Sequence, residues 1–121
     1  MGVKRVALGA PYAYDSMLKS KAYLELHGFE VPGCGVLENV VNIYDETPER
    51  AYELGKKVNT PDAQAVFLTG VGMPTLDMLE RLERDIGKPV ISSSSAMMWH
   101  ALRTAGVKTP VEGYGRLLSL P

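Results

Sequence analysis

The 121-residue sequence has little of what marks several classes of protein. Its one cysteine, Cys34, excludes an internal disulfide and fits a reducing compartment. The longest apolar runs are far shorter than the roughly 20 residues of a membrane-spanning helix. The net charge of −1 favours neither a nucleic-acid nor an anionic membrane partner. The first residues run straight into a predicted strand, so we expect no signal peptide and a cytoplasmic protein.

The sequence also lacks the motifs of several well-known sites. No Walker loop is present, and no Gly-x-Gly-x-x-Gly follows the first predicted strand. A phosphoacceptor receiver domain needs an aspartate at the end of its third strand, where this chain has Thr69 and Gly70. The two histidines, His27 and His100, have no second His or Cys at ligand spacing. These absences argue against a metal site and a nucleotide-binding loop.

What the sequence does contain is a strand–turn–helix pattern repeated four times. With 45% apolar and 22% charged residues, it has the composition of an ordinary globular protein, and its length predicts one domain over 1–121. The pattern predicts an α/β fold with a four-stranded parallel sheet and helices on both faces. The expected strands are 3–8, 29–31, 65–68 and 90–92, and the expected helices are 15–27, 48–58, 75–86 and 96–105. The residues expected to face inward on the last helix are Met98, Ala101, Leu102 and Ala105.

Capping residues and helix breakers set the expected ends of these elements. Asp15 or Ser16 is expected to cap the first helix. Thr47 followed by Pro48 is a strong start signal for the second. The Pro-Gly-Cys-Gly stretch at 32–35 interrupts the second strand, which we therefore expect to be short or to lie at the sheet edge.

The segment after the third strand, 70–75, is the expected centre of any site. In a parallel sheet the carboxyl ends of the strands meet at one edge, which brings together the turns at 9–12, 34–42, 69–75 and 92–95. These turns are rich in glycine, hydroxyl and amide groups and nearly free of charge. Such donors suit a small anion such as a carboxylate or phosphate. The alternative is that the same residues serve only as caps and turns.

The roles of Cys34 and Tyr12 can each be interpreted in two ways. Cys34 could be a reactive thiol, but a lone cysteine near a strand is more often a small buried apolar residue, and we favour burial. Tyr12 follows the first strand at the predicted ligand edge, where its phenol could donate to an oxyanion. It could equally be packed over a loop.

Five phrases, in order, resemble the aspartate/glutamate racemase superfamily, and its maleate cis–trans isomerase and arylmalonate decarboxylase branch in particular. The resemblance covers nearly the whole chain. The phrases are Arg5-Val-Ala-Leu with Pro11-Tyr12, His27-Gly-Phe-Glu-Val31, Phe67-Leu-Thr-Gly-Val-Gly with Thr75-Leu-Asp77, Gly87-Lys-Pro-Val-Ile-Ser-Ser-Ser94 with Trp99, and Gly113-Tyr-Gly-Arg-Leu-Leu118. Enzymes of this family have two flavodoxin-like halves with the active site between them, and this chain resembles the second half only.

The resemblance also implies roles for particular residues. Tyr12 and Asn42 match residues that bind the substrate carboxylate, although the loop around Asn42 aligns loosely. Val71 and Gly72 stand where the family uses backbone N–H groups, and Gly70 stands where the second-half cysteine belongs. The family uses neither metal nor organic cofactor. Because glycine has no thiol, no catalytic residue is expected within this chain.

Three hypotheses follow from the residues and the resemblance together. The first is one half of a cofactor-free isomerase, racemase or decarboxylase of small dicarboxylates, nearly inactive alone. The second is a non-catalytic carboxylate-binding module. The third is a homodimer in which a second copy replaces the missing half. The expected partners are thus a small dicarboxylate and either an N-terminal half or another copy of this chain.

Overall fold

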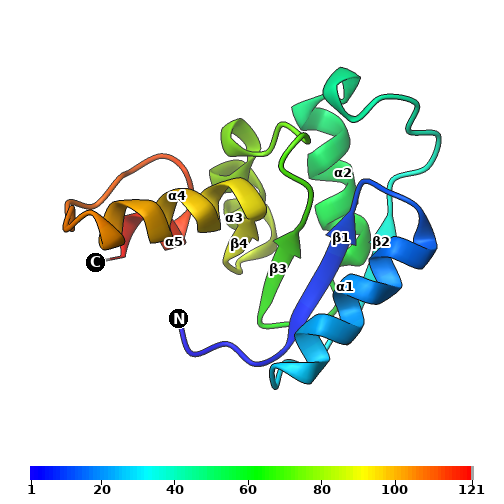
Figure 1. Ribbon diagram of the computed structural model, residues 1–121, viewed down its shortest axis with the longest axis horizontal. Coiled ribbons are helices and arrows are strands. Elements are labelled where there is room, and N and C mark those ends of the chain that lie inside the picture. The colour runs from blue at the N-terminus through cyan, green and yellow to red at the C-terminus, as the bar shows by residue number, and fades with distance from the viewer. Residues whose placement is uncertain (121) are drawn as a thin grey trace.

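The computed structural model describes residues 1–120 and contains one parallel sheet with the strand order β2-β1-β3-β4. All three strand pairs are parallel, and Leu8 of β1 pairs with both Cys34 of β2 and Phe67 of β3. Figure 1 shows the four strands side by side. The strands are β1 (Val6–Ala10), β2 (Cys34–Val36), β3 (Ala65–Leu68) and β4 (Val90–Ser92). This is the predicted fold class, and β3 and β4 lie where the sequence placed them.

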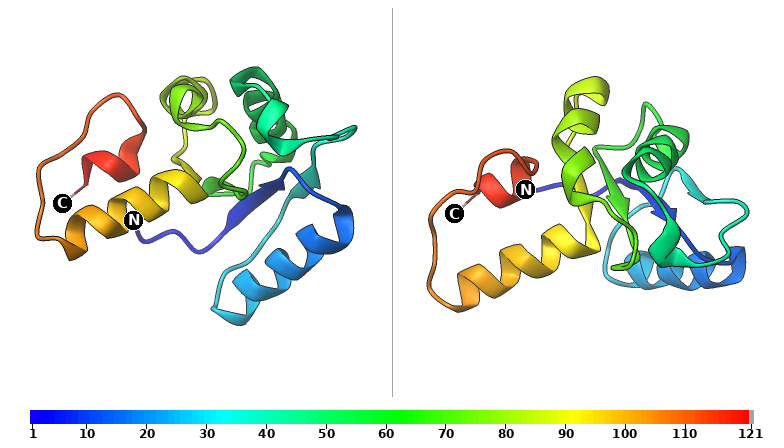
Figure 2. Two further views of the ribbon diagram at one scale, coloured as in Figure 1. Left: turned by 45° about the horizontal axis from the view of Figure 1, so that its top comes forward. Right: turned by 90° about the horizontal axis from the view of Figure 1, so that it is seen from above.

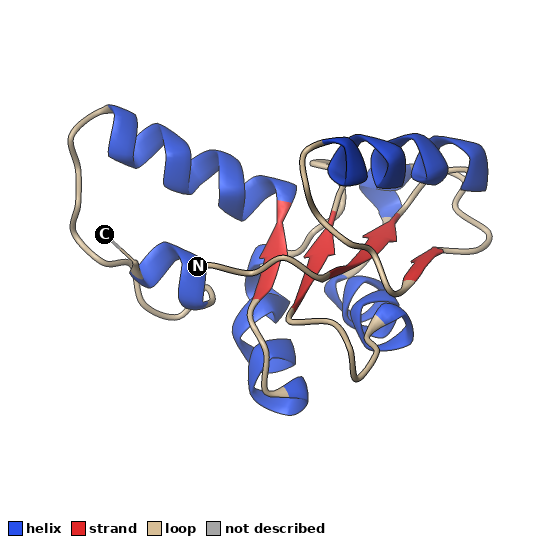
Figure 3. Cartoon of the chain, turned by 90° about the horizontal axis from the view of Figure 1, so that it is seen from below, coloured by secondary structure: helices blue, strands red, loops and turns tan. Residues whose placement is uncertain are grey.

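Helices lie on both faces of this sheet, as predicted. Helices α2 and α3 cover one face, and α1 and α4 lie on the other (Figure 3). Short 3-10 turns precede α2 and α3. The helices are α1 (Tyr14–Leu26), α2 (Pro48–Val58), α3 (Leu79–Ile86), α4 (Ser93–Thr104) and α5 (Arg116–Ser119), and the 3-10 turns are η1 (Ile43–Asp45) and η2 (Leu76–Met78). No helix within residues 1–120 is both long and apolar enough to cross a membrane.

The α2–α3 face holds most of the core. Helix α2 begins as its sequence predicts, because the Thr47 side chain accepts a hydrogen bond from the Arg50 N–H at 3.2 Å and Pro48 occupies the first turn. Its apolar stripe is buried against the sheet and α3. The buried residues of this cluster are Ala7, Ala51, Leu54, Val58, Ala63, Val66, Leu68, Met73, Met78, Leu79, Leu82 and Val90.

Three local predictions near the N-terminal half of the chain are wrong. Helix α1 starts after Ala13 and has no side-chain cap, so neither Asp15 nor Ser16 caps it. The second strand does not start at 29–31, where only an isolated bridge joins Glu30 to Arg5. It forms instead within the stretch that was expected to interrupt it, although at the predicted sheet edge. Cys34 is therefore the first residue of an edge strand and is exposed, not buried.

Helix α4 departs most from its sequence-based prediction. It leaves the end of β4 and extends beyond the sheet (Figures 2 and 3), packing mainly against β4 and α5. Met98 is 50% exposed, and Ala101 and Ala105 are exposed as well, so the predicted inward face is wrong. An apolar stripe is buried only where another element covers it, and for this stripe residues 1–120 supply none.

Candidate functional site

The carboxyl ends of β1 and β3 lie next to each other at the centre of the sheet. The chain leaves β1 toward β2 on one side and leaves β3 toward β4 on the other, which makes this position a topological switch point. In open α/β sheets, ligands bind in the crevice at such a point. The residues that follow the two strands, Tyr12 and Thr69, are thus placed where a ligand is expected.

A cluster of four hydroxyl groups, from Tyr12, Ser20, Thr69 and Ser93, occupies this position. The Tyr12 hydroxyl donates to Thr69 Oγ1 at 3.2 Å and shares a 2.9 Å hydrogen bond with Ser20 Oγ. Ser93 Oγ at the start of α4 also donates to Thr69 Oγ1, at 3.4 Å. The cluster joins β1, α1, β3 and α4 through neutral groups. Tyr12 is half-buried, so its phenol is both fixed in place and reachable.

The loop at 70–72 runs beside this cluster and is closely packed at both of its glycines. Gly70 has φ +98°, and a Cβ built on it would lie 2.5 Å from Pro11 Cγ. A Cβ built on Gly72 would lie 3.0 Å from the Ile43 side chain. The loop thus lies between the end of β1 and the turn η1, and a Cβ would fit at position 70 only if the backbone or Pro11 moved, whereas at position 72 it would make a close contact with the Ile43 side chain.

Two backbone donors of this loop are free for a ligand. The Gly70 carbonyl accepts a hydrogen bond from the Met73 N–H at 3.2 Å, which closes the turn. In the part of the chain that the structure describes, the N–H groups of Val71 and Gly72 donate to no other protein group. The Val71 side chain is 62% exposed, so the turn is open to solvent. Successive free N–H groups at a turn form an anion-binding arrangement.

Asn42 lies on the other side of the loop and is committed to a local role. It is exposed, and its Oδ1 accepts a 3.0 Å hydrogen bond from the Tyr44 N–H as the cap of η1. Within residues 1–120 it makes no hydrogen bond to the hydroxyl cluster. The structure therefore brings together Tyr12 and the 70–72 loop, whereas Asn42 caps the turn that packs against Gly72 and makes no hydrogen bond to the hydroxyl cluster among the described residues.

The serines after β4 divide between structure and site. Ser92 and Ser95 are buried and form a reciprocal capping box at the start of α4, with hydrogen bonds of 2.9 and 3.1 Å. Only Ser93 reaches the hydroxyl cluster. Ser20 belongs to the cluster too, and sequence reasoning missed it. Its contribution depends on how α1 packs beside β1, which no local motif signals.

Two recesses flank the cluster. One, of about 460 Å³, is lined by Ser20 and Thr69 and has Lys19 at its side, the one cationic side chain in that lining. The other, of about 340 Å³, is lined by Val71, Ser94 and the methionines of α4. No group of three or more His, Cys, Asp or Glu residues that could hold a metal occurs among the described residues. Cys34 lies at the amino end of β2, away from the carboxyl edge of the sheet.

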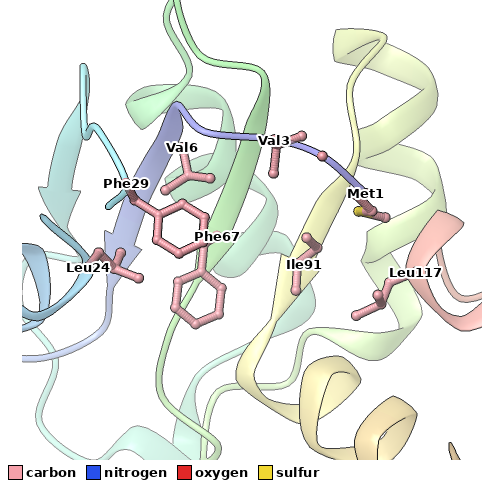
Figure 4. A pocket seen from close by; sticks show the side chains of 9 residues that line it. Met1, Val3, Val6, Leu24, Phe29, Phe67, Ile91 and Leu117 are labelled. Atoms are coloured by element: carbon pink, nitrogen blue, oxygen red, sulfur yellow. The ribbon is translucent and has the colours of Figure 1, made fainter. Parts of the chain in front are cut away.

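An apolar hollow of about 380 Å³ lies over the sheet between α1 and the C-terminal segment. Figure 4 shows Phe67 of β3 and Ile91 of β4 beside it, with side chains from the N-terminal segment and α5 around them. Phe67 and Ile91 are only half-buried. The residues that line it are Met1, Gly2, Val3, Val6, Leu24, Phe29, Phe67, Ile91 and Leu117.

Comparison with known proteins gives a consistent result. A family model described as arylmalonate decarboxylase matches residues 1–118. The chain is 35% identical to the arylmalonate decarboxylase of Bordetella bronchiseptica, over 97% of this chain and 51% of that protein. It matches the crystal structure of the maleate isomerase Iso from Pseudomonas putida S16 with a TM-score of 0.90 and 31% identity, over 98% of this chain and 49% of that one.

The structure of a third relative contains a covalent intermediate. A cysteine-to-serine variant of the Nocardia farcinica maleate cis–trans isomerase was solved with a covalently bound succinylcysteine intermediate. This chain matches it with a TM-score of 0.89 and 31% identity, over 97% of this chain and 49% of that one. The chain thus spans about half the length of the curated relatives it matches.

Proposed function

The chain belongs to the arylmalonate decarboxylase family, and on that premise we propose that it is the carboxylate-binding second half of a cofactor-independent isomerase, racemase or decarboxylase of small dicarboxylates. The observation that carries the proposal is the neutral donor array at the switch point. It consists of the hydroxyl cluster and the free N–H groups of Val71 and Gly72. Neutral donors fixed in place bind a carboxylate and stabilise the charge that develops on it in a transition state.

The same array contains hydroxyl and N–H groups but no thiol. A succinylcysteine intermediate requires a thiol, as in the Nocardia farcinica relative. Position 70, where the family resemblance places the second-half cysteine, is a glycine in this chain. We therefore propose that any thiol comes from another half, and that this chain alone binds without turnover.

The partner would cover the open side of the molecule. The apolar hollow over β3 and β4 and the exposed Met97 and Met98 of α4 are apolar surfaces that the described residues leave uncovered. An apolar surface of this kind favours association. The partner is an N-terminal half of the same fold or a second copy of this chain, which accords with the length of the relatives. Light scattering on a sizing column distinguishes a dimer from a monomer.

Titration of the purified chain with maleate and with malonate, followed by calorimetry, tests the binding proposal. We expect saturable binding that weakens at least about 10-fold in Tyr12→Phe, because one hydrogen bond to a charged group is worth about 1.5–3 kcal/mol. Tyr114→Phe is the matched control, since that tyrosine is 41% exposed and lies in the C-terminal segment, outside the cluster and the 70–72 loop. Equal affinity of all three proteins, or no saturation, would contradict the proposal.

The non-catalytic binding module is the second candidate, favoured by the absence of a thiol at position 70. The two candidates separate when an N-terminal half of a maleate isomerase or arylmalonate decarboxylase is added. Activity that appears only in the mixture supports the enzyme half. Binding without activity in any mixture supports the binding module, and turnover by this chain alone contradicts both.

A further inference from the structure

Helix α4 begins without any connecting residue after β4. Strand β4 ends at Ser92 and α4 starts at Ser93, whereas residues 11–13 separate β1 from α1. Ser92 caps α4 through reciprocal hydrogen bonds with Ser95, and both serines are buried. A helix that turns back over its own sheet needs a connection of about 2–6 residues after the strand. Helix α4 therefore leaves the sheet in a fixed direction and does not return over the face on which α1 lies (Figure 2).

The space that a returning helix would fill is a groove along α1. The recess beside the hydroxyl cluster and the apolar hollow both have Leu24 and Phe67 in their linings, so they are two parts of one depression, which we call the α1 groove. It runs over β3 from the hydroxyl cluster to Leu117 of α5, and Figure 4 shows its apolar part. Among the described residues, Lys19 is the one charged side chain that lines it. In an α/β fold an apolar sheet face of this kind lies under a helix.

Helix α4 itself carries an exposed apolar stripe, which we call the α4 ridge. A helix surface that faces solvent normally carries charged side chains. Arg103, the one charged residue of α4, is instead committed to the C-terminal segment, where its guanidinium donates to the carbonyls of Val107 and Leu120. The ridge is therefore apolar and uncharged along the whole helix. Its members, which follow helical spacing, are Met97, Met98, Ala101 and Ala105.

We propose that two copies of this chain associate about a two-fold axis and exchange α4, so that the α4 ridge of each copy lies in the α1 groove of the other. The ridge and the groove are both apolar, both uncovered and both on the same chain, which is the condition for a self-complementary interface. The chain cannot join them internally, because α4 follows β4 with no residue that would let it turn back. Exchange of an identical element is a low-cost route to a dimer, and the two-fold axis buries each surface twice.

The exchange also closes the carboxylate site, and this consequence rests on the proposed function. One end of the α1 groove is lined by two members of the hydroxyl cluster, Ser20 and Thr69. On the other side of the cluster, Val71, whose N–H group is free, shares a recess with the methionines of the α4 ridge. A partner that fills the groove and covers the ridge borders the donor array on two sides. It thereby lowers the exposure of the array to water, which strengthens hydrogen bonds to a carboxylate.

Light scattering on a sizing column, over a range of protein concentrations, tests the association. We expect the wild type to be a dimer and Ala101→Glu to be a monomer, because its carboxylate would be buried in an apolar groove without a partner. Ala22→Glu is the matched control and should remain a dimer, since Ala22 is an exposed alanine of α1 that does not line the groove. Circular dichroism checks that both variants fold. A dimer that persists in Ala101→Glu would overturn the proposal.

Cysteine cross-linking tests how the two copies dock. In a Cys34→Ser background, chains with Met98→Cys or Ala101→Cys are mixed with chains that carry Tyr23→Cys, at the groove, and the mixture is oxidised. A disulfide requires Cα atoms within about 7 Å of each other. We therefore expect a covalent mixed dimer with Tyr23→Cys and little with Ala22→Cys, the control on the same helix. Equal yields with the two partners, or no mixed dimer from either α4 position, would contradict the exchange.

The competing occupant of the groove is an N-terminal half like that of the longer relatives. A wild type that is monomeric at every concentration, and that forms a complex only when such a half is added, would overturn the exchange in favour of that occupant.

The maleate titration separates the exchange from the proposed function. Cross-linked dimers that do not bind maleate would support the exchange and contradict the function. Maleate binding by a monomeric wild type would support the function and overturn the exchange. When both hold, we expect Ala101→Glu to bind maleate several-fold more weakly than the wild type, and Ala22→Glu to bind it equally well.

Discussion

The two faces of the sheet differ although they share the same strands. On one face, α2 and α3 bury a cluster of twelve residues, several of them fully. On the other, the buried cluster contains only Leu8, Ala10 and Met17, and Phe67 is half-exposed at its margin. Helix α4, which would be expected to cover that margin, extends away from the sheet (Figure 3).

On the proposed function, this difference means that one face of the sheet is closed within this chain and the other by a second half or a second copy. The closed face needs nothing beyond this sequence. The open face combines an apolar hollow with a helix whose methionines are exposed, and burial of such surface contributes roughly 25 cal/mol per Å². The chain spans about half the length of its relatives. One well-covered face and one partly uncovered face therefore fit the proposal that a second half packs against this chain.

The largest expected effect is the loss of stability when a buried side chain of the closed face is truncated, compared with the truncation of an exposed side chain on α4. Leu82 on α3 is fully buried, so Leu82→Ala should lower the free energy of unfolding by about 2–5 kcal/mol. Met97 on α4 is 63% exposed, so Met97→Ala should change it by less than about 0.5 kcal/mol in the isolated chain. Urea denaturation measures both. Similar losses would mean that the open face is already closed in solution, for instance by a second copy, and repetition at several protein concentrations would detect it.

A somewhat smaller loss of stability is expected from replacing Glu83, which links α3 of the closed face to α5 in the C-terminal segment. The buried carboxylate of Glu83, on α3, accepts hydrogen bonds from the Val90 N–H at 2.8 Å and the Arg116 N–H at 3.0 Å. Glu83→Ala should cost about 2–3 kcal/mol, because two backbone donors lose their partner. It should also free α5, and with it the support of α4.

Fluorescence of Trp99 measures this release, because its indole N–H donates to the Leu120 carbonyl at 3.2 Å and it is the one tryptophan of the chain. We expect a red shift and a faster hydrogen exchange of α4 in Glu83→Ala, and smaller changes in Glu83→Gln, whose amide oxygen still accepts. Arg84→Ala, an exposed neighbour on the same helix, is the control. Loss of stability with no change in Trp99 fluorescence would show that the C-terminal segment stays packed against α4 without Glu83.

The smallest effect is a pH dependence on the closed face. The Tyr52 hydroxyl on α2 donates to Asp85 on α3, and this hydrogen bond raises the pKa of Tyr52 above its ordinary value of 10.0. In the unfolded chain the phenol ionises first, so the stabilising contribution is present below pH 10 and falls as the pH rises through the raised pKa. Tyr52→Phe should therefore flatten the alkaline decline in Tm. An unchanged alkaline slope would contradict this account.

The closed face was the part most accessible from sequence. Thr47 and Pro48 define the start of α2 because a cap and a first-turn proline act within a few residues of each other. The run 65–68 was placed correctly because a buried strand of a parallel sheet is continuously apolar. At these two places the determinants were local and the prediction held, whereas the local cap expected at Asp15 or Ser16 did not form.

The predictions that failed depended on distant parts of the chain. The stripe of Met98 and Ala101 was assigned to a core because periodicity reports a face and not what covers it. Cys34 was expected to be buried, but the edge position of its strand leaves it exposed. At the site, the sequence indicated Tyr12 and the 70–72 loop from their place after strands. The contact of Pro11 with Gly70 joins residues far apart in sequence and left no local signal.

The hydrogen bonds that hold the C-terminal segment to α3 and α4 also fix the position of α4 before any partner binds. The segment returns from α4 to α3 through the contacts of Arg116 with Glu83, while Arg103 and Trp99 of α4 bind the Leu120 carbonyl. Helix α4 is therefore held at its N-terminus by β4 and further along by the C-terminal segment. A surface held in its bound shape before encounter loses little conformational entropy on docking, which strengthens binding. On the proposed function, α4 would offer such a preorganised surface to the partner.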